Sequence, residues 1–127
     1  MFRPRTIALL AVPALALVSC GGSSAPTETL PANLDLVVTA VPSLRFDAAK
    51  YGPVKAGEVT IGYDNKDSVR HTLIIAKDDV KVPNFKLVIP EKGSVDSGSV
   101  TLQAGTYRLI CDVPGHSNMR ATLTVEP

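Results

Sequence analysis

The sequence predicts a small all-β domain, a sandwich or a barrel, over residues 34–127. Short runs rich in Val, Ile, Leu and Thr recur there at the spacing of strands, and Gly, Pro, Asn and Asp lie between them. The chain's ten prolines and nine glycines leave little room for long helices. Hydrophobic residues make up 45% of the chain and charged residues 20%, which is a globular composition.

Seven runs are expected to form strands. They are residues 34–41, 58–63, 71–76, 85–89, 97–102, 105–111 and 121–125. Residues 85–89 (FKLVI) alternate between apolar and polar, as a strand with one buried face does, and residues 71–76 (HTLIIA) are rich in β-branched side chains. Residues 48–51 could hold one helical turn. A domain of this size buries roughly two-thirds of its unfolded surface, which suffices for one core without a disulfide.

The N-terminal residues 1–19 have the pattern of a secretory signal peptide. Arg3 and Arg5 precede an almost wholly apolar run, residues 7–18. That run is too short to cross a bilayer core of roughly 30 Å. A buried N-terminal helix is the alternative, but no polar face follows the 3.6-residue period.

Leu17-Val18-Ser19-Cys20 resembles the lipobox of bacterial lipoproteins. The resemblance implies that Cys20 becomes the lipidated first residue and that the mature chain is extracytoplasmic, anchored on the periplasmic or cell-surface side of a membrane. The alternative is an ordinary signal peptide that leaves Cys20 as a free thiol. Residues 21–33, rich in Gly, Ser, Pro and Thr, fit a flexible tether between lipid and domain. The expected organisation is thus signal peptide 1–19, lipidated Cys20 with a tether to residue 33, and one domain over 34–127.

Charge and cysteine content exclude several classes. The formal net charge is +1, or −1 once Arg3 and Arg5 are removed, so nothing favours nucleic acid as a partner. Two cysteines exclude a multi-bridge disulfide scaffold and a zinc site of four thiolates.

Most of the chemically versatile residues lie in one segment. Cys111, His116 and Met119 fall within nine residues, between two expected strands, and His71 opens another expected strand. Two imidazoles, a thiolate and a weak thioether form the blue-copper electron-transfer set, because they suit Cu(I) and Cu(II) about equally. One metal site at one end of the domain would use them all.

Four motifs together resemble the cupredoxins, the blue copper proteins. They are residues 54–59 (VKAGEV), 65–72 (NKDSVRHT), 104–107 (AGTY) and 111–119 (CDVPGHSNM). The resemblance implies a Greek-key β-sandwich of about seven or eight strands. It also implies one copper ion per chain, bound by His71 Nδ1, Cys111 Sγ, His116 Nδ1 and Met119 Sδ. The His–Met gap of two residues is shorter than usual for this Cys–His spacing, so Met119 could instead only pack beside the site.

The same resemblance assigns supporting roles. Thr72, beside the first His, would tie the ligand loops together and hold the Cys111 sulfur through its backbone N–H, and Asn65 belongs to the same surroundings. Val113 and Pro114 would form an apolar rim at which transient redox partners dock. The expected protein is a monomeric carrier of single electrons with no enzymatic turnover.

Other functions stay open on the sequence. A copper carrier that delivers the ion to an oxidase or another cuproenzyme would use overlapping ligands, and a domain of purely structural role is a third possibility. Cys111 and His116 also suit a nucleophile–base pair, with Asp112 or Asn118 as the orienting group. Zinc would accept one Cys and two His, with water or Asp112 as the fourth ligand.

Overall fold

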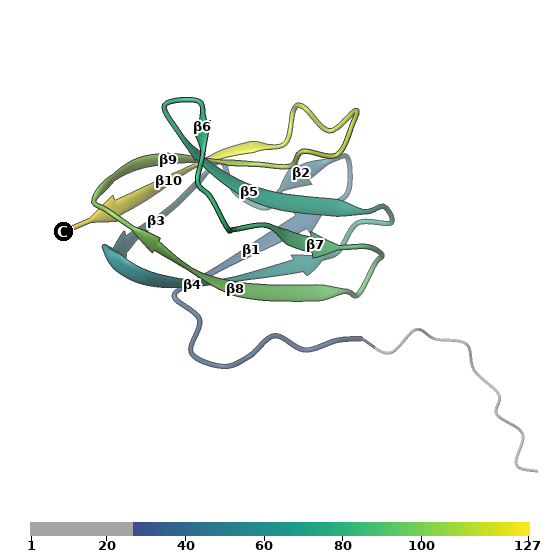
Figure 1. Cartoon of the computed structure of the whole chain (residues 1–127). Helices are drawn as coiled ribbons and strands as arrows, with labels where there is room; N and C mark the ends of the chain where they lie inside the picture. The colour runs from purple at the N-terminus through teal and green to yellow at the C-terminus, as the bar shows by residue number, and fades with distance from the viewer. Residues whose placement is uncertain (1–26) are drawn as a thin grey trace, which may run out of the picture.

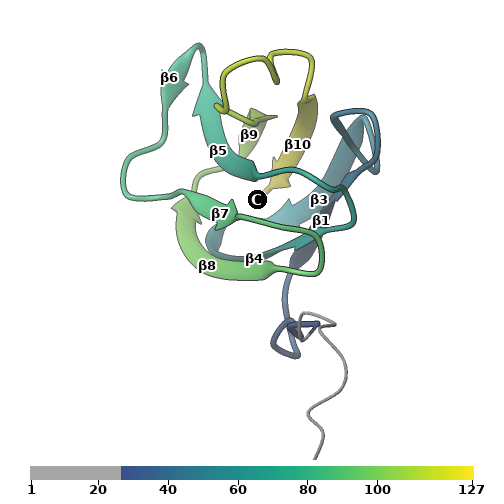
Figure 2. The same cartoon turned by 90° about the vertical axis from the view of Figure 1, so that its right-hand side faces the viewer.

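The computed structural model describes residues 27–127, which form two packed β-sheets (Figures 1 and 2). Ten strands follow one another without an intervening helix in this part of the chain. They are β1 (Leu36–Val41), β2 (Arg45–Phe46), β3 (Lys50–Lys55), β4 (Gly57–Asn65), β5 (His71–Lys77), β6 (Val80–Lys81), β7 (Leu87–Ile89), β8 (Val95–Leu102), β9 (Gly105–Ile110) and β10 (Arg120–Glu126).

The two sheets are mixed. One has the strand order β2-β1-β4-β8, and the other has the order β3-β10-β9-β5-β6, with β7 paired to β5. The pairs β1–β4 and β3–β10 are parallel, and the remaining pairs are antiparallel. Parallel neighbours require crossover connections, so the chain passes repeatedly from one sheet to the other. This is the expected all-β Greek-key sandwich.

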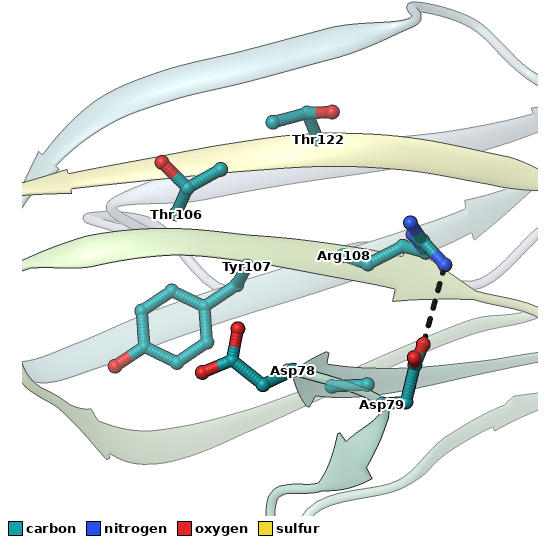
Figure 3. Close-up of a pocket in the computed structure, with 7 residues that line it drawn as sticks. Asp78, Asp79, Thr106, Tyr107, Arg108 and Thr122 are labelled. Atoms are coloured by element: carbon teal, nitrogen blue, oxygen red, sulfur yellow. Dashed lines mark ion pairs between the residues drawn. The ribbon is translucent and has the colours of Figure 1, made fainter.

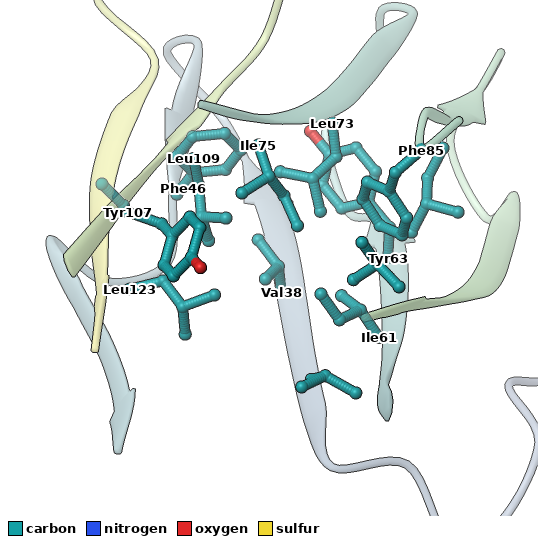
Figure 4. Packing of buried hydrophobic residues seen from close by; sticks show 14 of the residues in the cluster. Val38, Phe46, Ile61, Tyr63, Leu73, Ile75, Phe85, Tyr107, Leu109 and Leu123 are labelled. Atoms are coloured by element: carbon teal, nitrogen blue, oxygen red, sulfur yellow. The ribbon is translucent and has the colours of Figure 1, made fainter. Parts of the chain in front are cut away.

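The core lies between the sheets and is mainly aliphatic (Figure 4). Strand β4 alternates, with Val59, Ile61 and Tyr63 facing inward. Strand β5 is buried along most of its length, and its edges pair with β9 and with β6 and β7. Leu73 and Ile75 lie in the core, whereas the buried polar residues His71 and Thr72 lie at its start.

The structure differs from the sequence-based expectation at the short elements. It has ten strands where about seven or eight were expected, because β2, β3 and β6 lie outside the seven expected runs; β2 and β6 are two residues long, and all three are held by pairing rather than by a hydrophobic pattern. Strand β7 covers only the last three residues of the expected run 85–89. The helical turn considered at residues 48–51 is absent, and β3 begins at Lys50 instead because it pairs with β10.

The expected signal peptide 1–19 and the lipidation site Cys20 lie outside the described residues. Residues 27–33, assigned to the tether, are described and lie along the sheet of β4 and β8 (Figure 1). Within 27–127 no helix has the length and apolar character that a membrane crossing requires.

Candidate metal centre

Three donor residues that are distant in sequence meet at one end of the sandwich. His71 opens β5, Cys111 directly follows β9, and His116 lies in the loop that leads to β10. Strands β5 and β9 are antiparallel neighbours, with Ile74 opposite Ile110, so the start of one lies beside the end of the other. The strand pairing therefore places the expected donors together.

The donor atoms are close enough to share one ion. Cys111 Sγ lies 3.5 Å from His116 Nδ1 and 4.0 Å from His71 Nδ1. All three atoms lie within 4.8 Å of one another. Ligand bonds of about 2.0 Å to nitrogen and 2.3 Å to sulfur allow an N···S separation of up to roughly 4.3 Å, which both observed distances satisfy.

The burial of the donors is graded. His71 is 0% exposed and Cys111 2%, whereas His116 is partly exposed. Burial, followed by the charge of the neighbouring His71, lowers the pKa of His116 below its usual value. A lowered imidazole pKa favours the neutral form, which is the form that binds metal.

Backbone hydrogen bonds hold the loop of residues 111–119 in shape. The N–H of His116 donates to Val113 O at 3.0 Å, and that of Met119 donates to His116 O at 2.9 Å. Cys111 N–H donates to Met119 O at 3.3 Å and closes the loop. Gly115 has a φ of 86°, which a residue with a side chain rarely adopts. These bonds and the turn at Gly115 fix the backbone that carries His116.

Met119 and the rim residues occupy different surroundings. Met119 is 0% exposed and packs in the hydrophobic core at the end of this loop. Val113 is partly buried against the core, and Pro114 is exposed. An apolar surface therefore adjoins the exposed part of His116.

Thr72 links the two ligand-bearing segments. Its backbone N–H lies 3.4 Å from Cys111 Sγ, the contact expected from the sequence. Its hydroxyl accepts the Asp112 N–H at 3.0 Å and donates to Asp112 Oδ1. Lys86 Nζ contacts the other carboxylate oxygen at 3.1 Å. An N–H directed at sulfur stabilises a thiolate there.

Asp67 is a functional residue that the sequence did not single out. Its Oδ2 lies 2.9 Å from His71 Nε2, and the two side chains are 9% and 0% exposed. Asn65 positions it, because Asn65 Oδ1 accepts the Asp67 N–H while the Asn65 amide donates to Val69 O and Ile89 O. Its spacing of four residues before His71 was the available signal, but Asp in a polar loop is an ordinary turn residue.

The rival chemistries fit these contacts less well. A nucleophilic thiol needs access to a substrate, and Cys111 is buried beneath its neighbours. Asp112, the carboxylate considered as a zinc ligand, contacts Thr72 and Lys86 and is not in the donor cluster of the described residues.

A hollow of about 360 Å³ lies toward the end of the sandwich opposite the donor cluster, where Asp79 and Arg108 pair at 3.6 Å (Figure 3).

Comparisons with known proteins identify the fold. Auracyanin from the photosynthetic bacterium Roseiflexus castenholzii matches with a TM-score of 0.61 and 17% identity over 72% of this chain and 96% of its own. Auracyanin A, a "blue" copper protein from Chloroflexus aurantiacus, matches with a TM-score of 0.56 and 23% identity over 71% of this chain and 96% of its own. Auracyanin B matches with a TM-score of 0.58 and 26% identity over 84% of this chain and 97% of its own. No protein-family model and no curated protein matches the sequence.

A Greek-key sandwich with two imidazoles and a thiolate at one end defines the class of the blue copper proteins. This chain has that fold, the cupredoxin fold. Its cluster of His71, Cys111 and His116, with Met119 in the same loop, fits a single type 1 copper site.

Proposed function

We propose that this chain is a monomeric, extracytoplasmic electron carrier rather than an enzyme. It holds one copper ion with His71, Cys111, His116 and Met119 and passes single electrons between transient redox partners. The convergence of the His71, Cys111 and His116 donor atoms within 4.8 Å is the observation that carries the proposal. Bound copper supplies a couple of two oxidation states that differ by one electron.

The chain's own residues keep the site rigid. His71 is held by Asp67 on the side of the ring away from Cys111. Thr72 fixes the Cys111 sulfur from its backbone and Asp112 from its hydroxyl. A site with preset donors needs little rearrangement when its charge changes, which favours fast electron transfer over metal delivery.

The route for electrons leads through His116. His71 is fully buried, whereas His116 reaches the surface beside Val113 and Pro114. A partner that docks on this apolar rim approaches the imidazole edge directly. The net charge of the mature chain is small, so docking depends on the rim more than on long-range attraction.

The location forms part of the proposal and is supported by the sequence pattern at Cys20. Lipidation there, with more than one acyl chain, would hold the protein stably on the outer side of a membrane. A carrier confined to a surface meets membrane partners more often than one in free solution.

The absorption spectrum of the full mature chain with added Cu(II) tests this function. We expect an intense visible band from the bond between thiolate and copper, and Cys111→Ser abolishes it. Cys20→Ser is the matched control: it removes a cysteine outside the site, together with the proposed lipid attachment, and leaves the band intact. A colourless protein that releases Cu(I) readily to a chelator would support the copper carrier instead. A protein that takes up no copper would refute both functions.

A further inference from the structure

The chain enters the domain along an arm, residues 27–35, that lies on the sheet of β4 and β8. At its inner end, Asp35 N–H donates to Thr60 O at 2.9 Å, and the Asp35 carboxylate accepts the Thr60 N–H at 2.8 Å. Leu30 and Leu34 cover Gly62, where an added Cβ would lie 2.5 Å from Leu34 Cδ1. The arm is therefore packed against the sheet at its middle.

The outer end of the arm is fixed at the end of the sandwich that carries the ligand loops. Glu28 N–H donates to Gly93 O at 3.2 Å, and the Glu28 carboxylate accepts the Val95 N–H at 2.9 Å. Gly93 N–H in turn donates to Asn65 O at 2.9 Å. Asn65 begins the loop that holds Asp67 and delivers His71, so the arm leaves the domain at the end with the metal centre (Figure 1).

Cys20, the proposed lipid-attachment site, lies close in sequence to the outer end of the arm. Thr27 lies only seven residue steps beyond Cys20, with six residues between them. At 3.3–3.6 Å per residue these steps span at most about 25 Å. Strand β4, nine residues long, extends the domain by about 30 Å from one end to the other. An anchor at Cys20 therefore keeps the ligand-loop end near the membrane, and the opposite end is free to lie farther away.

From this geometry we infer that the anchored domain presents its ligand-loop end to the membrane. Its docking partner at His116 is then an integral membrane redox protein that exposes its electron-exchanging group at the membrane surface. The inference rests on the proposed function, namely on copper binding and on lipidation of Cys20. It goes further because it assigns an orientation and a class of partner.

Energy transfer to vesicle lipids tests the orientation. The full lipidated, copper-loaded protein is reduced, reconstituted in phosphatidylcholine vesicles and labelled at one introduced thiol, either Lys92→Cys or Gln103→Cys. Both positions are exposed; Lys92 adjoins Gly93 at the ligand-loop end, and Gln103 lies in the β8–β9 turn at the other end. We expect stronger transfer to an acceptor on the lipid headgroups from position 92. Equal transfer, or stronger transfer from position 103, overturns the inference.

Releasing the arm supplies a second test. Glu28→Ala combined with Leu30→Ser removes the side-chain contacts at the outer half of the arm and leaves only the Glu28 N–H bond to Gly93 O there. When the arm detaches, the free tether lengthens from about 25 Å (to Thr27) to about 50 Å (to Asp35). The difference between positions 92 and 103 should then shrink. Glu58→Ala, an exposed change on β4 away from the arm, is the control and should preserve the difference. A difference that persists in the arm-release variant contradicts the inference.

A ferrocene attached to a lipid headgroup tests the choice of partner. One electron passes from its Fe(II) to the bound Cu(II), and no proton or bond is involved. We expect faster exchange with the intact arm than with the arm-release variant, and equal rates overturn a membrane-facing docking surface. Two checks separate this outcome from failure of the proposed function. The visible band reports copper binding, and flotation with the vesicles reports lipidation, whose absence would also overturn the inference.

Discussion

The imidazole of His71 is held between a carboxylate and a thiol. Its Nε2 lies 2.9 Å from Asp67 Oδ2, and its Nδ1 faces Cys111 Sγ at 4.0 Å. A proton on Nε2, donated to Asp67, leaves the lone pair of Nδ1 free for a metal. Burial raises the pKa of Asp67, but hydrogen bonds from Ser68 and His71 outweigh this and hold it below its ordinary value. The carboxylate is therefore ionised beside the ring at neutral pH.

Asp67→Asn should raise the reduction potential of the copper centre. The ionised carboxylate makes His71 a stronger donor and favours Cu(II), and loss of such a contact weakens metal affinity roughly 10–100-fold. If Cu(II) binding weakens tenfold more than Cu(I) binding, the potential rises by about 59 mV. Voltammetry measures this. Asp64→Asn, which changes a surface carboxylate paired with Lys66, is the control. An unchanged or lower potential in Asp67→Asn would contradict a tuning role.

Met119→Leu tests whether the thioether reaches the metal. The exchange nearly conserves volume, so it should cost less than about 1.5 kcal/mol of unfolding free energy. If Met119 is the axial ligand, its removal shifts both the visible band and the potential. Leu123→Met, a similar exchange at another buried position, should alter neither property. An unchanged spectrum and potential in Met119→Leu would mean that Met119 only packs beside the site and does not bind the metal.

Thr72→Val should destabilise the connection between the ligand loops. Valine has a similar shape but cannot accept the Asp112 N–H, which Thr72 Oγ1 accepts at 3.0 Å. Losing this partly buried hydrogen bond, together with the one that Thr72 donates to Asp112 Oδ1, costs about 0.5–1.5 kcal/mol each, measurable by urea unfolding. Thr72→Ser keeps the hydroxyl and should lose much less. Equal losses in the two variants would mean that the methyl packing of Thr72, and not its hydroxyl, matters.

Tyr63→Phe should leave stability unchanged or raise it by up to about 1 kcal/mol. The Tyr63 hydroxyl is buried and has no hydrogen-bond partner among the described residues. Tyr107→Phe is the matched variant, because the Tyr107 hydroxyl donates to Gln103 O at 2.8 Å. That change should cost about 0.5–1.5 kcal/mol. Urea unfolding measures the stability of both variants, and a clear loss of unfolding free energy in Tyr63→Phe would disprove the prediction.

Asp112 should make part of the stability depend on pH. The hydrogen bond from Thr72, supported by Lys86, holds the pKa of this carboxyl below its usual value despite partial burial. A lowered folded-state pKa contributes stability above the unfolded value of about 4, and this contribution is lost as the pH falls through the folded value. The free energy of unfolding of the metal-free wild type should therefore exceed that of Asp112→Asn above about pH 4, and this difference should disappear as the pH falls below that value. A difference that stays constant across this range in urea unfolding would argue against the linkage.

The long strands and the loop of residues 111–119 were predictable because their signals are local. Apolar alternation in β4 and the apolar run of β5 follow from which faces are covered. Strands β2 and β6 carry no comparable pattern, since two residues are too few for periodicity, and β3 (KYGPVK) is mostly exposed and does not alternate. They exist because longer strands offer them a partner.

The residues that hold the donors were harder to predict. Thr72 was expected because it adjoins His71, whereas Asp67 resembled a turn residue until the buried loop placed it against the imidazole. Residues 27–33 of the arm belong to the stretch for which the sequence predicts a flexible tether, because Gly, Ser, Pro and Thr prevail in residues 21–33. Its contacts with Gly93 and Gly62 join positions far apart in the chain.

The amino-acid sequence by itself determined the all-β class, the candidate metal donors and their order along the chain, because strand periodicity and donor chemistry belong to neighbouring residues. Only the tertiary structure decided that His71 meets Cys111, that Asp67 supports the imidazole, and that the arm leaves beside the metal centre. These relationships depend on the pairing of β5 with β9 and of β4 with β8. Such pairings are fixed by burial of the whole core and by backbone hydrogen bonds across it, which no local stretch of residues encodes.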